Sequence, residues 1–267
     1  TMGASIIKLE NSDRGGDAFK SPEALEHYPN FIDWYKQLNQ AKNIIEISFK
    51  DQIDDLRNHI KQAQIVIAPE NKFFKNILKL ENLNSNQVVL YLSAGKGEWK
   101  KMHDLNALGL TKTFAQTLKY DQTLPYLPIA GLSFGQYAAS ASISSYLKCL
   151  MQKSAQVESI NLKDVCMSLL DVLHSDQLNA PEKFLHNGLY PCYNIYQSKD
   201  EHFICFAAIE ENYWSVFSEL FEIPLTLEQR FDTSGKTFDL LKNKFANLDA
   251  HEIRSVIKNK SICLTVV

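Results

Sequence analysis

The chain has 267 residues, enough for one large domain or two smaller ones, and its hydrophobic fraction of 45% is sufficient for a folded core. A formal net charge of −3 argues against a strongly basic nucleic-acid-binding surface and against an acidic disordered arm. No apolar run approaches the roughly 18 residues of a membrane span, and no basic and then apolar leader opens the chain. We therefore expect a folded cytoplasmic protein that binds neither nucleic acid nor membrane.

The cysteines point to a reducing compartment. There are five of them, an odd number, and none forms a CxxC pair. This pattern disfavours both a disulfide framework and a zinc site, so we expect no metal. Most of the five sit in apolar stretches, where cysteine behaves as a small hydrophobic residue.

The first half of the chain alternates between predicted strands and helices. Four short apolar runs are typical of strands, at residues 4–9, 44–47, 65–67 and 88–92. Residues 51–63 have helical spacing, because Ile53, Leu56 and Ile60 recur on one face. The alternation favours a parallel sheet with crossover helices, and such sheets bind ligands at the carboxyl ends of their strands.

The second half changes in character after about residue 180. Two helices are predicted before that point, at residues 135–151 and 162–173. An aromatic-rich hairpin follows, with strands at 191–196 and 203–209, and the chain closes on a short strand at 261–267. The fold class predicted is α/β, with a Rossmann-like large domain and a smaller α+β domain.

One motif suggests a serine hydrolase. Residues 131–135 read Gly-Leu-Ser-Phe-Gly, and they lie between an apolar stretch and a helix, which is the context of a nucleophile elbow around Ser133. Such an enzyme also requires an acid and a histidine later in the chain, and Asp232 or Asp239 with His251 has that order. No HGG-type loop precedes the serine, and the hairpin has no natural place in a hydrolase.

Several segments, in the right order, resemble landmarks of the α-methylacyl-CoA racemase branch of the family III CoA-transferases. The longest is the run PCYNIYQSKDEHFICFAAIEENYW, which resembles the opening of the family's small domain. The matching segments are residues 3–10, 15–17, 38–42, 63–69, 103–106, 191–214 and 261–267. The resemblance implies a CoA-binding large domain over residues 1–163, a helical linker over 164–187 and a small domain over 188–267.

The resemblance also implies a catalytic set. His103 would transfer a proton, and Glu210 would orient and charge that histidine. Ser133 stands where the family carries its catalytic aspartate. A carboxylate can accept and return a proton near neutral pH, whereas a serine hydroxyl requires a neighbouring base. Without the resemblance, His103 reads as a surface histidine and Glu210 as an acid at the start of a helix.

The expected contacts to coenzyme A, which is the carrier part of the substrate, are only partly retained. Lys42 is kept, Asn71 replaces an arginine, and Lys72 is a nearby point charge that can partly substitute for it. Gly95 lies in a turn that loosely resembles a phosphate cradle, and Asp104 is either a CoA contact or a helix cap.

We therefore expect a protein of the acyl-CoA racemase or CoA-transferase type that acts on or binds acyl-CoA thioesters, with turnover impaired because Ser133 replaces the family's catalytic aspartate. The alternatives are a catalytically silent CoA-ester-binding or partner subunit and the serine hydrolase described above. The resemblance further implies a homodimer.

Overall fold

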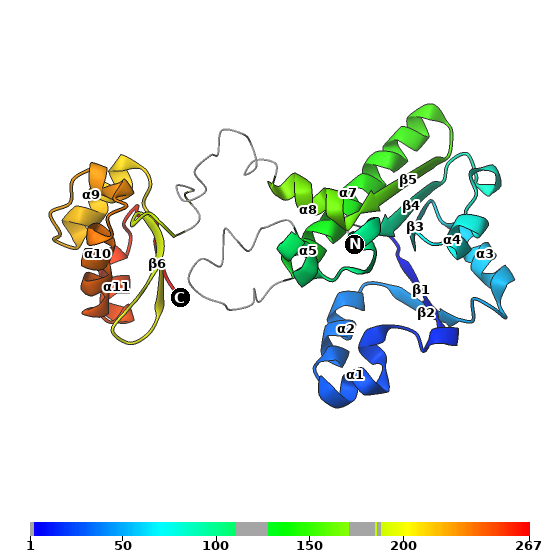
Figure 1. The fold of residues 1–267 in the computed structure, drawn as a ribbon, viewed down its shortest axis with the longest axis horizontal. Helices are drawn as coiled ribbons and strands as arrows, with labels where there is room; N and C mark the ends of the chain where they lie inside the picture. Colours follow the sequence, from blue (N-terminus) through cyan, green and yellow to red (C-terminus); the bar gives the residue numbers. More distant parts are fainter. Residues whose placement is uncertain (1–2, 111–127, 171–184, 186–187) are drawn as a thin grey trace. The chain divides into compact units, whose positions relative to one another are not determined.

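The computed structural model describes residues 3–110, 128–170, 185 and 188–267. The chain divides into two compact units, drawn in Figure 1. Unit 1 comprises Thr1–Ala107 and Leu127–Met167, and unit 2 comprises Leu108–Tyr126 and Ser168–Val267.

Unit 1 contains two parallel sheets. The first pairs β1 (Ile7–Asn11) with β2 (Asn43–Ile47), and the second has the order β3 (Ile65–Pro69), β4 (Val88–Ser93), β5 (Gln156–Asn161). The four strands predicted from apolar runs are thus confirmed, while β5 has no counterpart among the predictions. Its residues Gln-Val-Glu-Ser-Ile-Asn alternate in polarity, and the buried Gln156 at its start breaks the apolar pattern.

Along the chain, each strand of the two parallel sheets is followed by one or more helices. They are α1 (Pro22–His27), α2 (Phe31–Asn39), α3 (Ile53–Gln62), α4 (Lys72–Ile77), α5 (Asp104–Leu110), α7 (Ile129–Gln152) and α8 (Leu162–Leu170). The predicted helices at 51–63 and 162–173 correspond to α3 and α8, although residues 171–173 lie outside the described residues. The predicted helix at 135–151 corresponds to α7, which begins six residues earlier, at Ile129.

The core of the larger sheet lies around β4. Val88, Val89 and Leu90 are fully buried, because β4 has a parallel neighbour on each side. Gln87, which precedes β4, is also buried, and its Nε2 donates to the carbonyl oxygens of Ile60 (2.6 Å) and Ala63 (2.8 Å). These bonds satisfy carbonyl groups at the end of α3 and hold that helix to the sheet.

Unit 2 is a small α+β domain. Its antiparallel sheet has the order β6 (Tyr193–Gln197), β7 (Phe203–Ala207), β8 (Leu264–Val266), as the predicted hairpin and final strand require. Its helices are α9 (Glu211–Leu220), α10 (Lys236–Ala246) and α11 (Ala250–Ile257). Its core is aromatic: Phe206 and Phe217 lie with ring centroids 4.4 Å apart, and Trp214 and Phe245 are fully buried beside them.

The fold is therefore mixed α/β, with parallel sheets in unit 1 and an antiparallel sheet in unit 2. Most of the predicted linker, residues 164–187, falls outside the described residues, so its boundaries stay predictions. Within the described parts of the chain, no helix combines the length and the apolar character needed to cross a bilayer.

Candidate functional site

The carboxyl ends of β3 and β4 carry a small polar cluster. Glu70 follows β3, and its carboxylate contacts the ammonium of Lys75 at 2.7 Å and accepts a hydrogen bond of 3.0 Å from the hydroxyl of Ser93. The Lys75 hydrogen bond, aided by Ser93, holds the pKa of Glu70 below its usual value. The charge of Lys75 is thus already balanced by Glu70.

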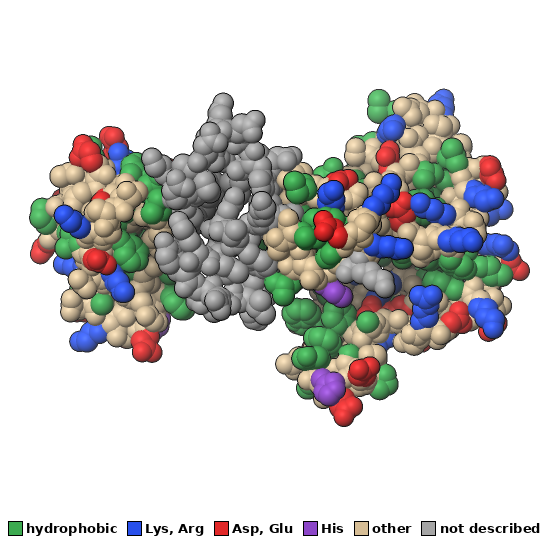
Figure 2. All heavy atoms as spheres, viewed as in Figure 1, with side chains coloured by type: hydrophobic (Ala, Val, Ile, Leu, Met, Phe, Trp, Pro, Cys, Tyr) green, Lys and Arg blue, Asp and Glu red, His purple; other side chains and the backbone are tan. Residues whose placement is uncertain are grey.

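Two of the predicted CoA contacts are engaged in local structure. Asn71 caps α4, because its Oδ1 accepts a 3.0 Å hydrogen bond from the backbone N–H of Phe74. Lys42 donates from Nζ to Oδ1 of Asn39 at 3.1 Å. Lys72 is the first residue of α4 and is exposed. In Figure 2, Lys and Arg side chains lie over the part of unit 1 that contains α3, α4 and β3–β5, with acidic side chains between them.

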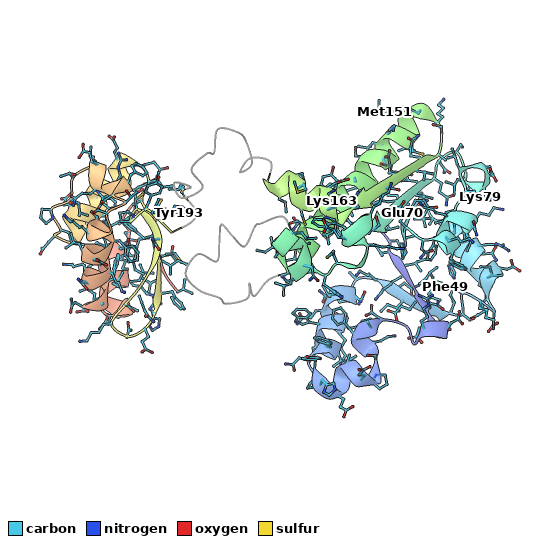
Figure 3. All side chains as sticks on the ribbon, in the orientation of Figure 1. Phe49, Glu70, Lys79, Met151, Lys163 and Tyr193 are labelled. Carbon is cyan, nitrogen blue, oxygen red and sulfur yellow. The ribbon has the colours of Figure 1, made fainter. Side chains whose placement is uncertain are left out.

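Gly95 lies in the turn that follows β4, and its backbone requires glycine. Its φ is +137°, and a Cβ on this residue would lie 2.8 Å from the Cβ of Trp99. The preceding residue, Ala94, accepts a 3.2 Å hydrogen bond from the backbone N–H of Lys163, at the start of α8. Figure 3 labels Lys163 and also Glu70, which follows β3. The turn is therefore fastened to α8 on one side and packed on Trp99 on the other.

His103 and Ser133 both belong to unit 1, and one hydrogen bond links their helices. Asp104, the first residue of α5, accepts a 2.6 Å hydrogen bond at Oδ1 from the backbone N–H of Gly131, in the first turn of α7. His103 immediately precedes Asp104, and Ser133 lies two residues after Gly131. His103 is exposed and Ser133 half-buried. Asp104 thus connects the beginnings of the two helices, and its predicted contact with CoA stays a prediction.

The prediction of a nucleophile elbow around Ser133 is wrong. Ser133 is the fifth residue of α7, and the N–H of Leu132 already bonds to the carbonyl of Pro128 at 2.9 Å. An elbow places its serine at a strained turn between strand and helix, whereas this serine lies within a regular helix.

The acid that the hydrolase alternative requires is also engaged elsewhere. Asp232 accepts hydrogen bonds from the backbone N–H of Ser234 (2.8 Å) and from the backbone N–H (3.0 Å) and hydroxyl (2.7 Å) of Thr237. These bonds hold its pKa far below the usual value and tie it to the start of α10. The other members of the supposed triad, Asp239 and His251, lie in α10 and α11 of unit 2.

Glu210 belongs to unit 2 and occupies the N-cap position of α9, although its side chain makes no capping hydrogen bond. It is exposed. The neighbouring Glu211 contacts Arg230 at 3.2 Å. Because Glu210 and His103 lie in different units, their pairing stays a prediction. Across the described residues, no group of three or more His, Cys, Asp or Glu side chains is placed to share a metal ion.

The family model for CoA-transferase family III matches residues 1–267. The chain belongs to CoA-transferase family III. A search of curated proteins found no match.

Solved structures with the same fold share little sequence with this family III chain. A hypothetical protein (Rv3272) from Mycobacterium tuberculosis has a TM-score of 0.74 at 17% identity, over 98% of this chain and 76% of its own. A CAIB/BAIF family protein from Brucella suis has a TM-score of 0.72 at 16% identity, over 98% of this chain and 76% of its own. The family thus accounts for the α/β fold and supports a function related to CoA esters.

Sequence reasoning missed two parts of this site. Glu70 and Ser93 were not singled out, although both lie at the carboxyl ends of parallel strands, where polar residues are expected to face ligands. The Asp104–Gly131 hydrogen bond joins residues 27 positions apart and left no signal in the local sequence.

Proposed function

We propose that this family III protein binds acyl-CoA thioesters in unit 1, near the starts of α5 and α7, and that His103 exchanges the α-proton of the acyl group. Membership of the family supplies the substrate class. The observation that carries the proposal is the Asp104–Gly131 hydrogen bond, since it holds the helix that begins just after His103 against the helix that contains Ser133.

The proposed chemistry is proton transfer to and from carbon. The neutral imidazole of His103 takes the α-proton, the C–H electron pair passes into the thioester, and the carbonyl becomes an enolate. Return of the proton from the same imidazole regenerates the substrate. Racemisation needs a second competent group on the opposite face, and the hydroxyl of Ser133 is a poor one near neutral pH. We therefore expect one-sided exchange to be faster than racemisation.

A catalytically silent, CoA-ester-binding protein is the second candidate. Asn71, a predicted CoA contact, caps α4, and the nearby positive charge of Lys75, in the same helix as Lys72, is neutralised by Glu70. Ser133 in place of a carboxylate points in the same direction. We also propose, on family resemblance, that the protein is a cytoplasmic homodimer, and light scattering of the purified chain tests the dimer.

The first experiment is calorimetric titration with acetyl-CoA and with a 2-methylacyl-CoA, followed by α-proton exchange of the latter in heavy water. We expect saturable binding and exchange that falls by about 100-fold or more in His103→Gln. His251→Gln is a matched control, because His251 is also exposed but lies in α11. Ser133→Asp should raise the rate of racemisation relative to exchange.

The outcomes separate the candidates. Binding without exchange supports the silent protein. Exchange that survives His103→Gln removes His103 from the mechanism. No binding at millimolar ligand overturns the proposed function as a whole.

A further inference from the structure

Two of the five cysteines lie on the antiparallel sheet of unit 2. Cys205 is the middle residue of β7, and Cys263 immediately precedes β8. Cys205 is exposed and Cys263 is half-buried, whereas Cys149, Cys166 and Cys192 are buried. All five are free thiols. A ligand that arrives from solution therefore meets the sulfur atoms of Cys205 and Cys263 first.

Both of these side chains point away from the core of unit 2. Successive side chains of a strand alternate between the two faces of a sheet. Ile204, Phe206 and Leu264, the residues next to the two cysteines, are 0%, 2% and 6% exposed and belong to the aromatic core. In Figure 1, helices α9, α10 and α11 lie on one side of this sheet. The two cysteines therefore lie on the other face.

This second face of the sheet is open to solvent. Ile195 of β6 pairs with Cys205 and is 61% exposed, and Phe203 of β7 is 57% exposed. Thr265 of β8, which pairs with Cys205 on its other side, is also exposed. A small ion can thus approach Cys205 without any movement of the backbone.

The register of β7 and β8 fixes how far apart the two cysteines are. Cys205 pairs directly with Thr265. The N–H of Ala207 donates a 2.8 Å hydrogen bond to the carbonyl of Cys263, which extends the pairing by one residue and places these two opposite each other. Cys205 and Cys263 are therefore diagonal neighbours on one face, and the Cα atoms of such pairs lie about 7–8 Å apart.

This spacing is too long for a disulfide but suits an ion held between the two sulfur atoms. The Cα atoms of a disulfide usually lie within about 6.8 Å of each other, and its Cβ atoms within about 4.5 Å. Two metal–sulfur bonds of about 2.3 Å separate the sulfur atoms by up to about 4.6 Å. A shared ion therefore spans a diagonal pair that a direct S–S bond does not.

The number and type of the ligands select the ion. Thiolates are soft ligands that favour monovalent copper, zinc and iron–sulfur clusters. Structural zinc sites are tetrahedral, with four protein ligands. Within the ranges that the structure describes, no third His, Cys, Asp or Glu side chain is placed to complete such a set. Monovalent copper, in contrast, accepts two thiolates in a linear arrangement.

We propose that Cys205 and Cys263 form a two-coordinate site for monovalent copper on the open face of the unit 2 sheet. Each thiol releases its proton to solvent as its sulfur bonds to the ion, so that one ion replaces two protons. The copper stays monovalent and the sulfur is not oxidised. The inference goes beyond the proposed CoA-ester function and does not rest on it.

The test is a titration of the whole, reduced chain with monovalent copper in the absence of oxygen, in competition with the coloured chelator bicinchoninate. We expect one ion per chain, with two sulfur neighbours in X-ray absorption. Cys205→Ser and Cys263→Ser should each weaken the affinity by about 100-fold or more, because a hydroxyl is a hard ligand. Cys166→Ala is the matched control, since it removes a buried thiol and should leave the affinity unchanged.

A second measurement needs no substitution. Iodoacetamide should alkylate Cys205 and Cys263 in the copper-free chain, and one equivalent of monovalent copper should slow both reactions by about tenfold or more, as read by mass spectrometry. Protection of only one of the two thiols overturns the proposal. So does an affinity that either serine variant leaves unchanged, or half an ion per chain with copper-dependent dimers, which would mean that the ion bridges two chains.

Discussion

At the scale of single residues, Glu10 of unit 1 is a buried carboxylate that requires charged and hydrogen-bonding partners. It is 3% exposed, and its carboxylate contacts the ammonium groups of Lys8 (2.9 Å) and Lys20 (2.7 Å) and accepts a 2.7 Å hydrogen bond from the hydroxyl of Tyr35. Burial alone would raise its pKa, but these three hydrogen bonds outweigh burial and lower the pKa to about 2. The charged form is therefore part of the folded state.

Glu10→Gln should destabilise the protein near neutral pH by about 2 kcal/mol, because it leaves two lysines without their shared partner. A carboxyl with a lowered pKa stabilises the fold above its ordinary value of 4.5, and that contribution is lost as the pH falls through about 2. The difference between wild type and variant should therefore shrink across this window. Denaturant titrations at several pH values measure it.

Glu46→Gln is the control for this prediction. Glu46 also contacts Lys20, at 2.5 Å, but its side chain is 59% exposed. An exposed ion pair contributes little, so we expect a loss below about 1 kcal/mol. A loss in Glu10→Gln that stays the same down to acid pH would show that packing, and not charge, is responsible.

At the scale of elements, the site depends on how α5, α7 and α8 meet. Asp104 bonds to the first turn of α7. Burial, and after it the nearby charge of Asp104, raises the pKa of the Cys166 thiol in α8. The position of Asp104 at the start of α5 and its bond to an N–H at the start of α7 place the carboxylate near two positive helix ends. The arrangement holds the backbone of His103 in one position relative to α7.

Asp104→Ala should release the start of α7. We expect faster exchange of the Gly131 amide and a loss of about 1 kcal/mol in the free energy of unfolding. Asp164→Ala is the matched control, since Asp164 is also a first-turn acid, but its carboxylate accepts a hydrogen bond from the side-chain amide of Asn161, three residues away. An unchanged Gly131 amide in Asp104→Ala would contradict the proposed link between the helices.

At the scale of the whole molecule, each of the two units has hydrophobic core residues of its own. In unit 1, Leu90 packs with Ala138, Ile160 and Val165. In unit 2, the core is built around the aromatic side chains near Phe217. Each unit has its own sheet and helices, so each has the means to fold as a unit.

We therefore expect calorimetry to resolve two unfolding transitions. Leu90→Ala and Phe217→Ala each remove a fully buried side chain, which costs about 2–5 kcal/mol. Each substitution should lower the midpoint of one transition and leave the other nearly unchanged. A single transition that moves with both substitutions would mean that the units unfold as one.

Much of the fold could be predicted from local sequence. The apolar runs around Ile45, Ile67 and Leu90 became β2, β3 and β4, because consecutive β-branched and other apolar residues favour strands of parallel sheets, and in β4, which has a neighbour on each side, the run is buried. The hairpin of β6 and β7 was equally clear, since aromatic and β-branched residues flank the polar turn before Phe203. Family resemblance, carried by segments in order along the chain, predicted the membership that the family model confirms.

Only the tertiary structure decided how the candidate site is built. The Gly-Leu-Ser-Phe-Gly motif is compatible with a turn or a helix, and α7 makes it helical. Asn71 became a cap of α4 and Lys75 a partner of Glu70 through contacts only three and five residues apart, which form where α4 begins. The bond between Asp104 and Gly131, by contrast, depends on packing of distant segments. Local sequence determines which backbone conformation is favoured, while contacts between distant residues determine which polar groups remain available for chemistry.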